Sequence, residues 1–172
     1  MRHRAVPFFT GAAAAYGLGF ALLLFAARLG ISPVQADAAP SRLETNILHS
    51  ALRASVARHA PTDGNPLPLP QTDRIMGATL YRQLCSRCHG LTARSDNTYG
   101  KSFYPPAPNL LLSGTTFSEG EIFWIVKHGI RNTAMPAWSN LLTDEEIWRV
   151  AGVVREFTST HGSDPAPLQA AP

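Results

Sequence analysis

The sequence predicts an all-α protein, in which a small helical domain follows one apolar N-terminal helix. Three observations support this. Segments within residues 72–158 place apolar side chains at helical spacing, two of these segments begin with a capping box, and no segment alternates strictly as a half-buried strand does. Helices this short and few make a thin core, so we expect a further apolar group to fill its middle.

The first helix is expected over residues 5–27, which carry no charge for 23 positions and follow Arg2 and Arg4. Such a run can cross a bilayer, which needs about 20 residues, and it exceeds the roughly 7–15 residues of a signal-peptide core. We therefore expect an inner-membrane anchor in a bacterium, with the two arginines in the cytoplasm and the domain in the periplasm. The alternative is a signal peptide cleaved after Val34-Gln35-Ala36, which would release a soluble periplasmic protein.

The chain after the anchor divides further by composition. A helix over 41–60 begins at a capping box of Ser41 and Glu44, and the proline-rich stretch that follows reads as a stiff linker. This helix is a spacer, a docking surface or an element packed loosely on its own domain. The expected boundaries are 1–31 for the anchor or signal, 32–71 for the helix and linker, 72–158 for the domain, and 159–172 for a disordered tail.

Charge excludes one class of function. Arg2, Arg4 and Arg28 account for the net charge of +3, and 12 Lys/Arg face 12 Asp/Glu from Ser32 onward. A nearly neutral soluble part argues against nucleic-acid binding.

Within the domain, the helix signals are local. Ser118 and Glu121 form the capping box of a helix that ends at Gly129, and Thr143 and Glu146 form that of the last helix. The expected elements are helices over 72–84, 118–129 and 143–158, with a loop-rich stretch at 91–117.

Both cysteines of the chain lie in Cys85-Ser86-Arg87-Cys88-His89. C-x-x-C-H is the motif of covalent haem c attachment. Two thiols one helical turn apart can reach two vinyl groups on one edge of the porphyrin, and the next residue then places an imidazole at the iron. We expect one haem c, attached through Cys85 and Cys88 and ligated by His89.

Three other interpretations of the motif are weaker. A redox-active dithiol is typical of a β-α-β context, which is absent from the sequence. A structural zinc site needs two further ligands at suitable spacing. A plain disulfide leaves His89 unexplained.

The second axial ligand must come from another part of the chain. Met135 lies in a loop after the helix that ends at Gly129, and Pro136 stiffens this loop. Met1 is the first residue, and Met76 lies on a helix where packing is the expected role. Met135 is therefore the expected ligand, His128 is the second candidate, and a core-filling role for Met135 remains open.

These residues resemble the class I c-type cytochromes, the mono-haem type of bacterial respiratory chains. The resemblance covers residues 72–158 and rests on Gly77 and Tyr81, on CSRCH, on Ala107-Pro108-Asn109-Leu110, and on Met135-Pro136. It implies a cytochrome c-like helical domain wrapped around the haem, whose last helix crosses the first near Gly77. The sequence departs from the family on that last helix, where Val153 stands in place of an aromatic residue.

The resemblance also implies roles for three further residues. The Pro108 carbonyl would accept a hydrogen bond from His89, as a ligating imidazole requires. Arg131 and Trp138 resemble residues that contact the haem propionates, although a solvated arginine and a core tryptophan are equally good interpretations.

The predicted function is one-electron transfer without enzymatic activity, because His89 and Met135 would leave no open position at the iron. The resemblance implies partners such as a quinol-oxidising complex, a periplasmic dehydrogenase or a terminal oxidase. The alternatives are a subunit of a larger oxidase or dehydrogenase, a peroxidase-like or gas-binding haem enzyme if Met135 is not bound, and a dithiol oxidoreductase.

Overall fold

The computed structural model describes residues 5–31, 34–67, 70–91, 97–113 and 115–159. Within these ranges every regular element is a helix, which confirms the predicted all-α class. The expected tail lies, from residue 160 on, outside the described residues. The chain separates into two compact units, residues 1–38 and 39–172, each described by itself below.

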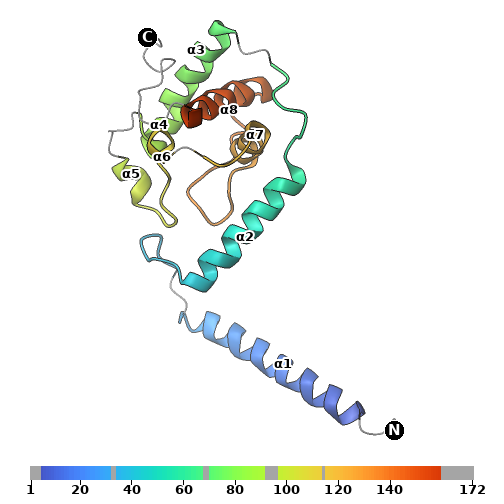
Figure 1. Ribbon diagram of the computed structural model, residues 1–172. Coiled ribbons are helices and arrows are strands. Elements are labelled where there is room, and N and C mark those ends of the chain that lie inside the picture. Colours follow the sequence, from blue (N-terminus) through green and yellow to red (C-terminus); the bar gives the residue numbers. More distant parts are fainter. Residues whose placement is uncertain (1–4, 32–33, 68–69, 92–96, 114, 160–172) are drawn as a thin grey trace. The chain divides into compact units, whose positions relative to one another are not determined.

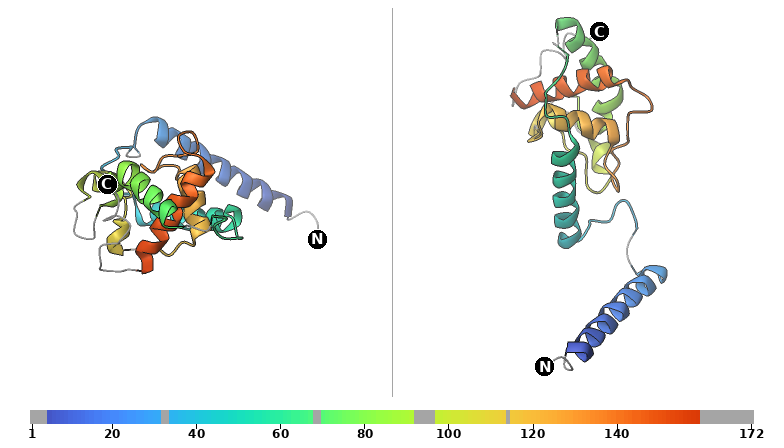
Figure 2. Two further views of the ribbon diagram at one scale, coloured as in Figure 1. Left: turned by 90° about the horizontal axis from the view of Figure 1, so that it is seen from above. Right: turned by 90° about the vertical axis from the view of Figure 1, so that its right-hand side faces the viewer.

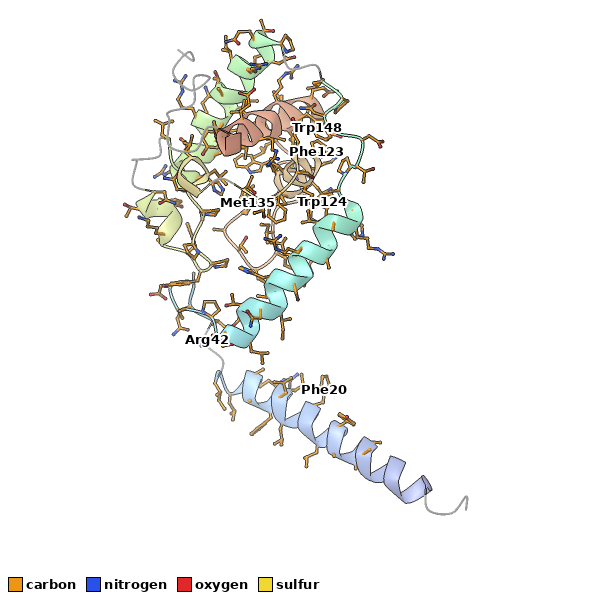
Figure 3. The ribbon with its side chains drawn as sticks, in the orientation of Figure 1. Phe20, Arg42, Phe123, Trp124, Met135 and Trp148 are labelled. Carbon is orange, nitrogen blue, oxygen red and sulfur yellow. The ribbon has the colours of Figure 1, made fainter. Side chains whose placement is uncertain are left out.

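The first unit contains α1 (Ala5–Arg28). Its segment Gly11–Arg28 is long and apolar enough to cross a membrane, and large side chains such as Phe20 and Leu23 are exposed along it (Figure 3). An exposed apolar helix near the N-terminus is consistent with a membrane anchor or a signal sequence.

The second unit is built on α3 (Gln71–Leu80), α7 (Glu119–His128) and α8 (Asp144–Ser159), which lie together in Figures 1 and 2. Both capping boxes predicted within residues 72–158 are present. The Ser118 N–H donates to the Glu121 carboxylate over 2.7 Å, and the Thr143 N–H donates to that of Glu146 over 2.8 Å. Each box pairs N–H groups that a helix start leaves without intrahelical partners.

Helices α3 and α8 cross at Gly77. A Cβ atom at Gly77 would stand 2.5 Å from the carbonyl oxygen of Arg149 and 3.0 Å from a methyl carbon of Val153. Only glycine allows this approach, which confirms the crossing expected there. An ion pair beside it, Arg149 Nε to Asp73 Oδ1 at 2.7 Å, joins the two helices.

One turn from the crossing lies an aromatic contact that the sequence analysis did not anticipate. The ring of Phe157 on α8 meets the ring of Tyr81 edge to face, with centroids 4.9 Å apart, and both side chains are buried. Although Val153 stands where the family has an aromatic residue, the two helices still share an aromatic contact, which Phe157 supplies.

The first helix of the domain does not stop where the motif begins. After α3 the chain forms one π-helical turn, η2 (Tyr81–Cys85), and then α4 (Ser86–His89), so the motif lies on a nearly continuous helix. The stretch expected to be loop-rich contains two short helices, α5 (Thr98–Lys101) and α6 (Leu110–Ser113).

Helix α2 (Arg42–His59) begins at Ser41, whose Oγ accepts the Glu44 N–H over 3.2 Å, which is one of the two hydrogen bonds of the predicted capping box. Its C-terminal half packs on the domain. Val56 is fully buried, and the His59 ring stacks on Trp124 of α7 with centroids 6.1 Å apart (Figure 3). Of the three roles considered for this helix, packing on its own domain is therefore the one that the C-terminal half of α2 shows.

Candidate functional site

The two cysteines are one turn apart where the π-helical turn passes into α4. Single π-helical turns within α-helices are frequent at functional sites. The buried hydroxyl of Tyr81, at the start of this turn, donates to the Gly90 carbonyl over 2.9 Å. This hydrogen bond joins the residue after the C-x-x-C-H motif to the start of the π-helical turn that precedes the motif.

Both cysteines border an apolar cavity of about 240 Å³. Ordinary protein cores contain few voids larger than a water molecule, so this one is shaped for an occupant. It is lined by side chains from η2, α4, α6, α7 and α8, and from the loops at residues 105–108 and 130–138. Six of the seven predicted site residues line it: Cys85, Cys88, His89, Pro108, Met135 and Trp138. Arg131 is exposed and follows Ile130, which does line the cavity.

The His89 ring is held by the loop opposite. Its Nδ1 lies 2.9 Å from the Pro108 carbonyl oxygen, which can only accept, so Nδ1 carries the proton. Burial lowers the pKa of His89, and the hydrogen bond to Pro108 opposes this in part. A neutral imidazole with Nδ1–H engaged has its Nε2 lone pair free to bind a metal.

Asn97 supports this arrangement, and the sequence analysis missed it. It is the buried polar side chain of the described core, with 5% of its surface exposed. Its amide donates to the carbonyl of Cys88 over 3.1 Å and to that of Ala107 over 2.9 Å. It thereby joins the motif to the residue before Pro108. No periodic pattern marks a single asparagine in a loop.

Met135 lies on the loop between α7 and α8 (Figure 3) and is half-buried. The loop is closed by its own hydrogen bonds: the Ile130 N–H donates to the Met135 carbonyl and the Met135 N–H to Thr133 Oγ1, both over 3.1 Å. Gly129 has φ +66°, and a Cβ there would stand 2.6 Å from the carbonyl carbon of Pro136. This glycine therefore allows the loop to close with Met135 at the cavity.

The second candidate ligand is placed elsewhere. His128 is exposed, and its ring lies against Trp124 with centroids 5.1 Å apart. It does not line the cavity that His89 and Met135 share.

The Cys85 thiol does not have the character of the attacking cysteine of a redox-active dithiol. Burial, and secondarily the neighbouring Cys88, raises the pKa of the Cys85 thiol to about 12. Reactive dithiols have a lowered pKa, because the thiolate is the nucleophile.

A helical fold around an apolar cavity that is bordered by C-x-x-C-H is the arrangement of a c-type cytochrome domain. Residues 75–152 match the model of a family described as cytochrome C oxidase, cbb3-type, subunit III. They form a mono-haem, class I-like c-type cytochrome domain.

The comparisons with curated proteins and with solved structures give less information about this chain. No curated protein matches the chain. Among solved structures, a chain of the Kuenenia stuttgartiensis reducing HAO-like protein complex Kustc0457/Kustc0458 is similar, with 22% identity and a TM-score of 0.45 over 56% of this chain. The match spans 50% of that chain's own length.

A cytochrome c domain implies haem c, and the residues present fit this group. The cavity is apolar, as a porphyrin ring requires, and it meets two thiols, a neutral imidazole and a thioether.

Proposed function

We propose that this chain is a one-electron carrier whose haem c is attached through Cys85 and Cys88 and ligated by His89 and Met135. When bound, haem c supplies the one-electron couple of its iron. The observation that carries the proposal is that His89 and Met135 border the same apolar cavity from different elements, while His128 lies outside it. Two protein ligands leave no open position for a substrate, which favours electron transfer over catalysis.

The chain's own residues would tune this couple. Pro108 fixes the His89 tautomer, and a thioether ligand raises the potential relative to a second imidazole. Trp138 and Arg131 are the proposed partners of the propionates, with Trp138 in the cavity wall and Arg131 at the exposed side.

The ligand assignment is tested with Met135→Ala and the matched variant His128→Ala, each as the full haem-loaded chain. The wild type and His128→Ala should keep the weak absorption band near the red edge that reports sulfur–ferric iron bonding. Met135→Ala should lose this band and, once reduced, bind carbon monoxide readily. Loss of the band in His128→Ala instead would refute Met135 ligation and reopen the peroxidase-like alternative.

We further propose that α1 anchors the carrier in the bacterial inner membrane with the haem domain in the periplasm. An anchored carrier works in a membrane-associated respiratory or dehydrogenase-linked chain. A quinol-oxidising complex, a periplasmic dehydrogenase and a terminal oxidase are the candidate partners. The balanced charge beyond Ser32 gives no preference among them.

A second candidate is a subunit of a larger oxidase or dehydrogenase. The matched family model is described as a subunit of a cbb3-type oxidase, which favours this alternative. Solubilising native membranes in mild detergent separates the two. A free carrier migrates alone on a native gel, whereas a subunit co-migrates with its complex in fixed proportion.

A further inference from the structure

Helix α2 carries an apolar stripe that the described part of the chain leaves uncovered. Leu43 and Ile47 are 70% and 55% exposed, and Ala51 and Ala54 are exposed as well. Their spacing of four, four and three residues places them on one side of the helix. The stripe precedes residues 75–152, so it is a feature of this chain outside the matched domain.

The C-terminal half of α2 is packed on the domain by residues on the side of the helix away from the stripe. Val56 is fully buried, and the Arg53 guanidinium lies over the Phe117 ring at 5.4 Å and donates to Thr116 Oγ1 over 3.3 Å. Arg53 thus holds α2 to the segment before α7, and the burial of Val56 shows that the helix is also packed at that position. The stripe is therefore a fixed surface of the haem domain.

Charge on α2 favours an anionic partner. The helix contains Arg42, Arg53 and Arg58 and one acidic residue, Glu44, so its net charge is +2. Residues 60–172, by contrast, hold nine Lys/Arg and ten Asp/Glu. An exposed helix that combines aliphatic side chains with arginines is typical of binding at an anionic lipid surface.

The chain also keeps α2 close to a bilayer if α1 spans it. Residues 29–41 join α1 to α2, and 13 residues extend at most about 45 Å. Two aliphatic side chains would hold a free protein only weakly on lipid. A helix tethered this closely binds in an effectively intramolecular step, for which weak contacts suffice.

We propose that the face of α2 formed by Leu43, Ile47, Ala51 and Ala54 lies in the headgroup region of the bilayer that α1 spans. This rests on the proposed anchoring by α1. The contact would limit rotation of the haem domain on its tether and present the haem site to partners in the same membrane.

The test uses the full haem-loaded chain in vesicles of phosphatidylcholine and phosphatidylglycerol. Because the haem would consume both native cysteines, Ile47→Cys offers one thiol for an environment-sensitive fluorophore. His49→Cys, exposed on the other side of the helix, is the matched control. We expect a blue-shifted emission, and several-fold stronger quenching by nitroxide lipids, for the probe at position 47 only.

Each other outcome overturns the proposal in a distinguishable way. Equal water exposure of both probes in vesicles that retain the protein excludes the lipid contact and leaves α1 anchoring intact. Shielding of position 47 that appears only in native membranes assigns the face to a protein partner. Loss of the protein from vesicles in an alkaline wash shows that the anchoring itself is wrong.

Discussion

The imidazole of His89 donates its Nδ1–H to the carbonyl oxygen of Pro108 over 2.9 Å, across 19 residues of chain. The bond fixes the tautomer that leaves Nε2 free, and it increases the basicity of the imidazole as a ligand. Pro108 is itself positioned through its neighbour Ala107, whose carbonyl accepts from the buried amide of Asn97. The position of His89, the proposed ligand, thus depends on Asn97, which does not line the cavity.

Replacing Asn97 by alanine is expected to loosen this support. Two carbonyls, those of Cys88 and Ala107, lose their donor, and we expect a loss of about 2–4 kcal/mol in the free energy of unfolding. The reduction potential should rise, because a weaker His89–Pro108 bond makes the ligand less basic and stabilises ferric iron less. Denaturant unfolding and a potentiometric titration measure the two effects. Exposed Asn140→Ala is the control, and an Asn97→Ala variant that matches it in both would rule out the supporting role.

The buried Tyr81 is expected to make the stability of the protein depend on pH in the alkaline range. Burial raises the pKa of Tyr81 well above its usual value of 10.0. Above about pH 10 the unfolded chain releases the phenolic proton while the folded chain keeps it, so this contribution to stability is full below that pH and falls as pH rises further. The slope is up to about 1.4 kcal/mol per pH unit.

Tyr81→Phe should remove this alkaline loss, at a cost of about 1 kcal/mol at neutral pH for the hydrogen bond to Gly90. Unfolding free energies of both proteins between pH 8 and pH 11 give the comparison. Parallel pH profiles would contradict the assignment of a neutral, buried Tyr81.

Gly77→Ala tests the crossing of α3 and α8. A methyl group there would press on the Arg149 carbonyl, so the helices must separate, and we expect a loss of about 1–3 kcal/mol. Thr72→Ala, at an exposed position of the same helix, should change stability by no more than about 0.5 kcal/mol. Similar unfolding midpoints for the two variants would mean that the helices do not approach this closely.

Local signals predicted much of the fold. The capping boxes at Ser118 and Thr143 identified α7 and α8, because a cap depends on residues three apart in sequence. The C-x-x-C-H motif identified the attachment site for the same reason, since its chemistry is confined to five consecutive residues. Gly77 marked the crossing through its resemblance to the family.

Contacts between distant residues could not be predicted in this way. The stacking of His59 on Trp124 and the edge contact of Tyr81 with Phe157 join residues more than 60 positions apart. Asn97 has no pattern around it, and its role appears only when Cys88 and Ala107 are brought together. The structure identifies Asn97 because its polar side chain is buried, and a buried polar side chain needs hydrogen-bond partners.

The most direct test of the account is the mass of the purified full chain, expressed with its maturation machinery and measured after denaturation, with a reduced-minus-oxidised spectrum of the same sample. The account predicts the polypeptide plus one haem, no thiol open to labelling, and the sharp bands of a low-spin haem c. A colourless preparation of bare polypeptide mass, with two reactive cysteines, would contradict it.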